Sequence, residues 1–255
     1  MKSMYPELDL DLSFHPIVCE TPRHFTREQI DGYNEQGYIT GVPLFEGSEL
    51  EAVRDFFSRS RKRLTSYDQF QAFHHEIPEL YDIVTHPVTT DYLKDLLGPN
   101  IICHTSQYIR KQPDPNSSRR TVYHQDATFN PMDARCALVW LAIDEAFVEN
   151  GCMGFIPGSH RLGVIECEEA GHHIPDAGRY GEVVPIELKP GQAVFFSDLL
   201  IHASPPNRTA DRPRGGFTAT YASADLVPTL GRKKWAVLCC GEDANDNWQV
   251  HPRPQ

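Results

Sequence analysis

The sequence predicts a mainly β protein with flanking helices, whose core is a jelly roll or barrel. From residue 100 onward, short runs of β-branched and aromatic residues are separated by Gly, Pro and Asn, the pattern of short strands joined by turns. Eight such runs favour a jelly roll or barrel over a doubly wound sheet. The region before residue 100 instead shows the spacing of amphipathic helices.

The first predicted helix covers residues 26–36. Thr26 and Gln29 have the spacing of a capping box, and Gly37 is a stop signal at the other end. A strand over Tyr38–Val42 is expected to follow directly.

Two more helices are expected before the β region. Ser48 and Glu51 form a second capping box, and apolar residues then repeat at helical spacing to about Arg63. A further helix is expected over Val88–Leu97 and ends at Gly98. Because their pattern is plainly amphipathic, these helices are expected to pack rather than to carry chemistry.

Strands and turn signals alternate through the rest of the chain. The expected strands are Ile101–Lys111, Thr121–Asp126, Arg135–Asp144, Cys152–Pro157, Val183–Leu188, Gln192–Phe196, Leu200–Ala203 and Gly216–Ser223. Turns are expected at Glu149-Asn150-Gly151, Pro157-Gly158-Ser159 and Pro190-Gly191. The longer connections Pro113–Arg120 and Arg161–Glu182 are candidates for substrate contact, because long loops on a rigid β scaffold often carry function.

The chain is expected to be a single domain. Its 255 residues can bury a substantial core and lie within the size of one β-rich domain. We expect a helical part over about 24–98, the jelly-roll core over about 100–224 and a C-terminal extension over 225–255.

Charge and cysteine usage exclude several classes of partner and compartment. Lys and Arg (24) against Asp and Glu (35) give a net charge of −11, which repels nucleic acid and anionic membranes. The acidic N-terminus is not of the signal-peptide type, and no apolar run has the length of a membrane span. Seven cysteines without a C-x-x-C pair indicate reduced thiols, so a cytoplasmic location is expected.

The stretch Tyr123–Asp126 carries the strongest chemical signal. On a strand, His124 and Asp126 point to the same face, and His202 lies on another expected strand 202 − 124 = 78 residues downstream. Two imidazoles and one carboxylate are the facial set that leaves open positions on non-haem Fe(II). A buried histidine bonded to a nearby carboxylate is the simpler alternative for this motif.

Two arginines strengthen the metal interpretation. Arg212 and Arg214 follow His202 by ten and twelve residues. The planar guanidinium pairs with two carboxylate oxygens at once, which suits a dicarboxylate cosubstrate beside the metal.

Further motifs occur in a fixed order along the chain. They are Phe25-Thr26-Arg27-Glu28-Gln29 leading to Gly37-Tyr38, Gly98-Pro99-Asn100-Ile101, Lys111-Gln112-Pro113-Asp114, His124-Gln125-Asp126, Asn150-Gly151-Cys152-Met153, Pro157-Gly158-Ser159-His160, and His202-Ala203-Ser204 followed by Asn207, Thr209 and Arg214. With them, the chain from about Phe25 to Tyr221 resembles the phytanoyl-CoA dioxygenase family of Fe(II)- and 2-oxoglutarate-dependent oxygenases.

The resemblance implies a double-stranded β-helix (cupin-like jelly roll) and a set of site residues. It implies that His124, Asp126 and His202 bind Fe(II), and that Arg214, helped by the hydroxyl of Ser204, holds the distal carboxylate of 2-oxoglutarate. The family's usual arginine lies eleven residues after the second histidine, where Pro213 stands, so Arg212 remains the alternative anchor.

Three more residues match cosubstrate positions in this family. Gln107 and Lys111 match positions near the keto-acid end, and Trp140 matches an aromatic residue that lines the same pocket. Each has a purely structural alternative: Gln107 could satisfy a strand neighbour, Lys111 could be solvated, and Trp140 could be core. Candidates for substrate contact are Phe129, Asn130, Met132, His172, His173 and Arg179.

The resemblance also implies the reaction. It implies oxidative decarboxylation of 2-oxoglutarate by O₂, with succinate and CO₂ released and an unactivated C–H of a small metabolite or natural-product intermediate hydroxylated or otherwise oxidised. Halogenating relatives replace the carboxylate ligand by a small residue, so Asp126 favours hydroxylation. The sequence leaves the oligomeric state open.

Two other classes of function are the alternatives. A non-catalytic jelly-roll module for metal sensing or protein interaction has no need of cosubstrate arginines. A zinc hydrolase needs a general base near the metal, and only Glu145 and Glu149 are nearby acids in the sequence.

Overall fold

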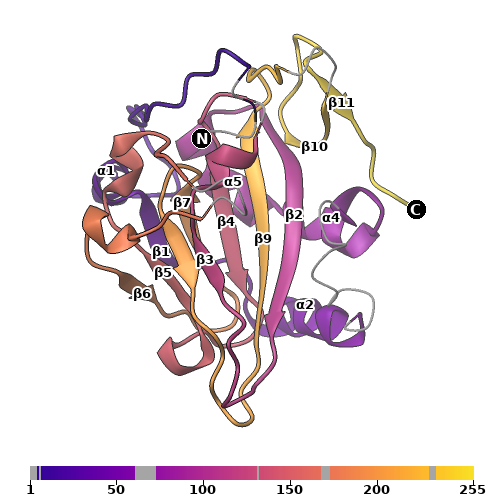
Figure 1. Ribbon diagram of the computed structural model, residues 1–255. Helices are drawn as coiled ribbons and strands as arrows, with labels where there is room; N and C mark the ends of the chain where they lie inside the picture. Colours follow the sequence, from indigo (N-terminus) through magenta and orange to yellow (C-terminus); the bar gives the residue numbers. More distant parts are fainter. Residues whose placement is uncertain (1–4, 6, 61–72, 131, 168–172, 230–233) are drawn as a thin grey trace.

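Two β-sheets face each other, and helices cover the outer face of the larger one (Figure 1). The structure is a computed structural model that describes residues 5, 7–60, 73–130, 132–167, 173–229 and 234–255. No helix within those ranges has the length and apolar character needed to cross a membrane.

The larger sheet has seven strands and the smaller has four. In spatial order the larger contains β1 (Tyr38–Pro43), β7 (Gln192–Ser197), β4 (Ala137–Ala142), β9 (Arg214–Ser223), β2 (Ile101–Lys111), β10 (Lys234–Cys240) and β11 (Trp248–Val250). The smaller contains β3 (Thr121–His124), β8 (His202–Ser204), β5 (Met153–Phe155) and β6 (Val184–Ile186). Every pairing is antiparallel except that of β10 with β11, so the predicted mainly β jelly-roll fold is confirmed.

The helices before β2 agree partly with the sequence. The described α-helices are α1 (Arg27–Gln36), α2 (Gly47–Arg59), α4 (Pro78–Val84) and α5 (Pro87–Leu97). The short 3₁₀ helices are η1 (Phe73–His75), η2 (Asp126–Phe129), η3 (Val148–Asn150), η4 (Ser159–Leu162) and η5 (Ala177–Tyr180). The helix α4 was not predicted, because seven residues are too few to show a helical repeat.

The two predicted capping boxes have opposite outcomes. In α1, the Thr26 side chain accepts a hydrogen bond from Gln29 N, the Gln29 side chain accepts one from Thr26 N, and Gly37 closes the helix at φ +91°. In α2 the prediction is wrong: the helix already begins at Gly47, so Ser48 lies within its first turn. The predicted end of this helix, residues 61–63, lies outside the described residues.

The strands differ from expectation at the ends that matter for function. β2 covers the predicted residues, whereas β3 stops at His124 and Asp126 begins η2. The region 225–255, expected to be an extension, contributes β10, which pairs with β2 and widens the larger sheet.

Each face of the larger sheet packs against a different core. On the outer face, Tyr108, Phe217 and Leu141 meet the helices, and Tyr108 stacks on Phe57 with ring centroids 4.5 Å apart. On the inner face, Trp140 and Val194 pack against β5 and β6 of the smaller sheet. Because side chains alternate along a strand, residues in register with Trp140 point into the same space between the sheets.

Candidate metal centre

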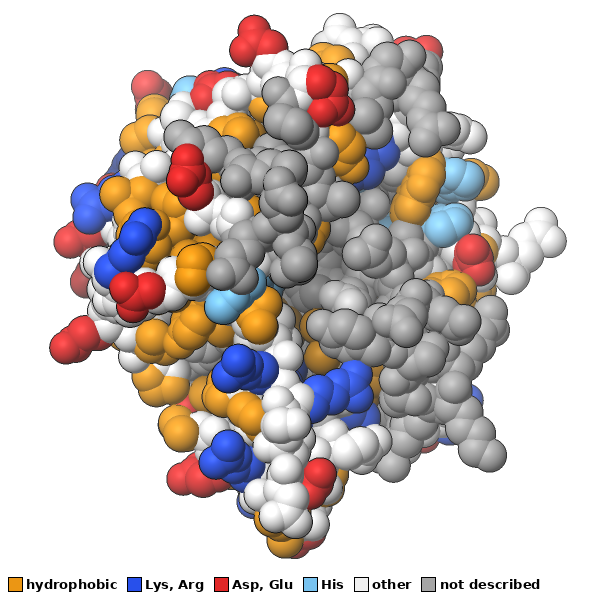
Figure 2. All heavy atoms as spheres, viewed as in Figure 1, with side chains coloured by type: hydrophobic (Ala, Val, Ile, Leu, Met, Phe, Trp, Pro, Cys, Tyr) orange, Lys and Arg blue, Asp and Glu red, His pale blue; other side chains and the backbone are white. Residues whose placement is uncertain are grey.

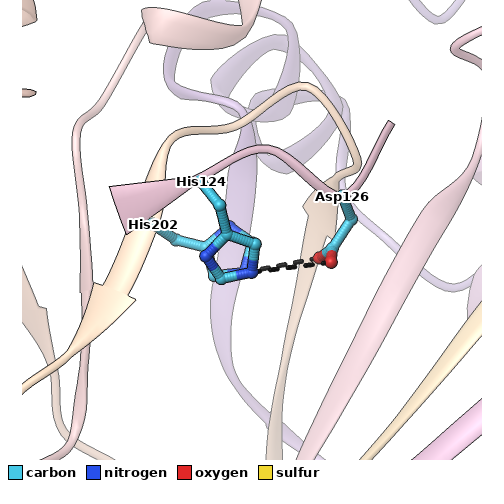
Figure 3. A group of neighbouring side chains, drawn as sticks. All are labelled: His124, Asp126 and His202. Atoms are coloured by element: carbon cyan, nitrogen blue, oxygen red, sulfur yellow. Dashed lines mark ion pairs between the residues drawn. The ribbon is translucent and has the colours of Figure 1, made fainter. Parts of the chain in front are cut away.

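Three side chains converge between the two sheets (Figure 3). His124 is the last residue of β3 and His202 the first of β8, and they are directly opposite each other in the β3–β8 pairing. Their ring centroids lie 4.2 Å apart. Asp126 completes the group, with Oδ1 3.6 Å from His124 Nε2 and Oδ2 3.3 Å from His202 Nε2. All three ligating atoms lie within 4.8 Å of one another.

Asp126 shares a side with His124 although β3 is shorter than expected. Gln125 lies outside the strand but keeps an extended backbone, with φ −122° and ψ 129°. One extended residue preserves the alternation of side chains, so the residues flanking Gln125 project together. The expectation that both lie within a strand is wrong, while the expected projection is observed.

Backbone carbonyls orient both imidazoles. His124 Nδ1–H donates to the Val122 carbonyl at 2.7 Å, and His202 Nδ1–H donates to the Leu200 carbonyl at 2.9 Å. Because a carbonyl can only accept, each ring keeps its Nε2 lone pair free and directed toward Asp126.

The charge states suit a metal. Burial, with the neighbouring His124, lowers the pKa of His202 to about 4, so this ring is neutral at pH 7. Burial alone would raise the pKa of the Asp126 carboxyl, but the lowering effect of the two imidazoles is larger. The pKa therefore lies below its ordinary value, and the carboxyl is ionised at pH 7. Burial lowers the pKa of His124, but the hydrogen bond and attraction to Asp126 raise it by more, so it lies above its ordinary value. A metal ion on Nε2 takes the place of a proton there, so two imidazoles and one carboxylate are the donor set of non-haem Fe(II) and fit the ion. No second group of three His, Cys, Asp or Glu side chains with this spacing occurs in the described ranges.

Gln125 ties the two ligand-bearing segments together. Its buried amide donates to the carbonyls of Gly163 (2.9 Å) and Leu199 (2.6 Å), and its Oε1 accepts from Ile165 N (2.9 Å). Leu199 lies three residues before His202. The sequence indicated only that Gln125 turns away from the metal side, because these partners are distant in the chain.

Arg214 is a buried cation without a carboxylate partner among the described contacts. It is 1% exposed and begins β9. Its Nε and Nη2 both donate to the Gly151 carbonyl, at 3.0 and 2.8 Å, and its Cζ lies 5.2 Å from the Trp140 ring centroid. Burial lowers the pKa of Arg214 to about 10, which still leaves it charged at neutral pH. Since a buried charge needs a counter-charge, this guanidinium is suited to an anionic ligand.

The predicted turn at Asn150-Gly151 places the carbonyl that Arg214 uses. Asn150 closes the turn by donating to Glu145 O and accepting from Phe147 N. Gly151 has φ +79°, and a Cβ there would lie 2.4 Å from the Pro205 carbonyl oxygen, so only glycine fits.

Lys111 is a second buried basic residue beside Arg214, directly opposite it in the β2–β9 pairing. It is 5% exposed, so the solvated alternative is wrong. Its Nζ donates to the carbonyls of Ser204, at 2.8 Å, and Pro205, joining β2 to the end of β8. Burial, with Arg214 adding to the effect, lowers the pKa of Lys111 to about 6.

Arg212 lies in a different environment. Its side chain is 53% exposed, it pairs with Glu145 at 2.5 Å, and it stacks over Phe147. Arg214 is therefore the arginine that faces the buried space. Glu145 is held at the surface by this pair and Glu149 is exposed, so neither belongs to the metal group.

Gln107 and Trp140 share the inner face of the larger sheet. Both are in register with Thr218 of β9, whose buried hydroxyl has no hydrogen-bond partner. The Trp140 indole lies flat over Gly216, where a Cβ would be 2.0 Å from Cζ2. Trp140 is also part of the core between the sheets. The same side chain therefore packs in the core and lies next to Arg214.

The residues expected to contact substrate do not lie together in the structure. The Phe129 side chain is 38% exposed, and its ring lies 6.1 Å from that of His124. Asn130 reaches the Asp126 carbonyl at 3.4 Å. Met132 is buried and packs with Cys136 in a separate apolar cluster. Arg179 bonds to Tyr180 in the long loop, and His172 lies outside the described residues.

Sequence and structure comparisons agree with this geometry. The family model for phytanoyl-CoA dioxygenase (PhyH) matches residues 33–216. A probable phytanoyl-CoA dioxygenase of Caenorhabditis elegans is 30% identical over 70% of this chain and 60% of its own length. The human peroxisomal phytanoyl-CoA dioxygenase is 30% identical over 84% of this chain and 74% of its own. A methylphosphonate hydroxylase of Gimesia maris is 26% identical over 79% and 83%.

Solved structures show the same fold. The non-haem monooxygenase ThoJ in complex with nickel matches with a TM-score of 0.71 and 26% identity over 88% of both chains. EctD from S. alaskensis, solved with 2-oxoglutarate and 5-hydroxyectoine, matches with a TM-score of 0.74 at 18% identity over 97% of this chain and 94% of its own. Together with the family match, these findings establish that the chain belongs to the phytanoyl-CoA dioxygenase family of non-haem iron, 2-oxoglutarate-dependent dioxygenases.

Proposed function

We propose that this enzyme hydroxylates, or otherwise oxidises, an unactivated C–H bond of a small metabolite or natural-product intermediate. In this proposal 2-oxoglutarate and O₂ are consumed, and succinate and CO₂ are released. The observation that carries the proposal is the buried Arg214, which has no carboxylate partner among its described contacts and begins a strand of the sheet that faces the His-Asp-His group.

His124, Asp126 and His202 would hold the iron. Three protein donors are fewer than such an ion takes, so positions would remain for the keto acid and O₂. The bound iron would supply the activation of O₂, which no side chain can perform. The protein's part is to orient both Nε2 atoms through the carbonyls that bind the two Nδ1 atoms, and to hold the Asp126 carboxylate beside them.

Arg214 would anchor the distal carboxylate of 2-oxoglutarate, with the Ser204 hydroxyl beside it. Lys111 adds an amino group at the same end of the proposed pocket and joins the two sheets there. Gln107 and Trp140 would line the space between this end and the metal. Coulombic attraction is several times stronger in such a buried site than in water, so the charged Arg214, which has no acidic partner among its described contacts, favours an anionic group.

Acidic and basic side chains are mixed on the surface despite the net charge of −11. On the face seen in Figure 2, Lys and Arg side chains lie in the lower half of the view and also at its left edge, with Asp and Glu side chains among them.

The carboxylate of Asp126 favours oxygen transfer over halide transfer, because as a metal ligand it would take a position that a halide would need. The named relatives include dioxygenases of phytanoyl-CoA and a hydroxylase of methylphosphonate, whose names give different substrates. We therefore propose the reaction class and a small-molecule substrate.

The same proposal covers the organisation of the chain. We propose that residues 1–255 form one oxygenase domain, since β10 from the C-terminal region pairs with β2 of the core. Seven free cysteines support a reducing compartment such as the cytoplasm.

A succinate-release assay tests the proposal. The protein loaded with Fe(II) is incubated with 2-oxoglutarate and O₂, with and without a panel of candidate substrates. We expect O₂-dependent succinate and CO₂, stimulated by the true substrate. Metal binding without any O₂-dependent succinate would instead identify a non-catalytic metal-binding module.

A further inference from the structure

The N-terminal strap, residues 11–15, is bonded to the loop that follows Asp126. Asp11 N donates to Asp133 Oδ1 at 2.9 Å, and Ala134 N donates to the Asp11 carbonyl at 2.9 Å. The Asp11 carboxylate also pairs with Arg135 at 3.2 Å. The loop that starts at Asp126 is therefore held at its far end by the strap.

The strap also holds the segment that contacts Gln125. Val164 N donates to the Leu12 carbonyl at 3.0 Å, while Gly163 O and Ile165 N bond to the Gln125 side chain. A Cβ on Gly163 would lie 2.7 Å from the Leu12 carbonyl oxygen, so the close approach requires glycine. Residues 163–165 thus lie between the strap and Gln125 and are bonded to both.

Apolar contacts reinforce these bonds. Leu12 and Phe14 are partly buried and pack against a small cluster near the metal group: Ala127, Ala134, Val164 and Leu199. Ala127 follows Asp126 directly, and the Leu199 carbonyl accepts from Gln125. The strap therefore packs against residues that border both ligand-bearing segments.

Side-chain bonds within the strap hold its shape. The Asp11 carboxylate accepts from Ser13 N at 3.1 Å and lies 2.6 Å from His15 Nε2. These bonds already fix the backbone of the turn. Packing Leu12 and Phe14 against the cluster therefore costs little additional conformational entropy.

We propose that the strap is a positioning element of the metal centre. It touches neither the three candidate ligands nor Arg214 in any described contact, yet it holds the loop after Asp126 and, through residues 163–165, the side chain of Gln125. Loosening the strap would let the three ligand atoms spread, so metal binding would have to order them again. The inference rests on the proposed function, because it takes His124, Asp126 and His202 as the ligands.

The test measures Mn(II) affinity in full-length variants, well below each variant's melting temperature. The double variant Leu12→Ala/Phe14→Ala removes the strap's packing, and Val18→Ser is the matched control, since Val18 lies just beyond the strap and is 87% exposed. Residues that orient metal ligands change affinity by about 10–100-fold when removed. We expect the double variant to bind Mn(II) about tenfold more weakly than the wild type. The control should bind Mn(II) with unchanged affinity.

A second readout separates positioning from general stability. The affinity for 2-oxoglutarate, measured at saturating Mn(II), should change less than about twofold, because the strap does not contact the Arg214 end of the pocket. A lower melting temperature with wild-type Mn(II) affinity would show a purely structural role and overturn the inference. If the double variant does not fold, Asp11→Asn is used, and an unchanged Mn(II) affinity there overturns it equally.

The wild-type protein distinguishes the two levels of failure. If it binds no Mn(II), the ligand assignment itself is wrong and the inference falls with it. If it binds Mn(II) and the strap variants bind equally well, only the inference is wrong.

Discussion

Arg214 and Arg212 have the same side chain two positions apart but entirely different surroundings. Arg214 is buried against Gly151 and Trp140, whereas Arg212 is paired with Glu145 at the surface. The two arginines therefore form a matched pair for testing which one anchors the cosubstrate.

We expect Arg214→Met to weaken 2-oxoglutarate binding by at least about 30-fold, because a charged hydrogen-bonding group facing a buried carboxylate contributes about 2–5 kcal/mol. Arg212→Met should leave the affinity within about threefold, since exposed ion pairs contribute little. Isothermal titration of the Mn(II)-loaded variants with 2-oxoglutarate measures both. The reverse order of effects would make Arg212 the anchor.

Asp198 is a buried carboxyl that the sequence did not single out. Burial, with Asp126 nearby, raises its pKa to about 8, and its Oδ1 has no hydrogen-bond partner. A carboxyl whose pKa is higher in the folded than in the unfolded state binds more protons when folded. Stability is then lost as the pH rises between the unfolded value, near 3.8, and about 8.

Asp198→Asn should remove this dependence. We expect the wild-type free energy of unfolding to fall by up to ~1.4 kcal/mol per pH unit through the window from pH 5 to 8, and the variant to fall less steeply. Urea unfolding of both proteins at several pH values measures the two slopes. Equal slopes would show that Asp198 does not titrate as described.

At the scale of elements, the helical layer depends on a side chain of α5. Asp95 is buried, and its carboxylate accepts from the backbone N of Arg23, His24 and Phe25 at 2.8–3.1 Å. It thereby fixes the segment that leads into α1.

Asp95→Ala should cost about 2–3 kcal/mol of stability, since it leaves several donors without their charged acceptor. The matched control on the same helix is Asp91→Ala. Asp91 pairs with Lys94 at 2.7 Å with both side chains more than a third exposed, so its loss should cost less than about 1 kcal/mol. Chemical denaturation of both variants compares them, and equal costs would contradict this role for Asp95.

The same scale shows what the sequence can and cannot predict. β2 was predicted residue for residue because its long β-branched and aromatic run is bounded by Pro99-Asn100 and Pro113. The second capping box was wrong because the Ser–Glu spacing also fits the first turn of a helix that has already begun. β10 was missed because only its pairing with β2 distinguishes a strand there from an irregular tail.

The three side chains of the metal group could be predicted from the sequence. The distant contacts that hold them in place could not. The spacing in His124-Gln125-Asp126 and the family resemblance indicated the three converging side chains. The roles of Gln125 and the strap depend on partners about 38 to 150 residues away, which no local pattern encodes.

For the molecule as a whole, the two sheets bring distant parts of the chain to one enclosed site. β3 and β8 of the smaller sheet carry the two imidazoles, while β2 and β9 of the larger sheet carry Lys111 and Arg214. Both basic side chains donate to carbonyls next to strands of the smaller sheet, so the site proposed for the cosubstrate is also a junction between the sheets.

The most direct test of the account is an anaerobic titration of the protein with Fe(II) and 2-oxoglutarate, followed by visible absorption. A keto acid bound to iron through both its oxygens gives a weak charge-transfer band, which we expect in the wild type and in Arg212→Met. The band should be absent from Asp126→Ala and His202→Ala. No band in the wild type, or an undiminished band in those two variants, would contradict the metal centre proposed for His124, Asp126 and His202.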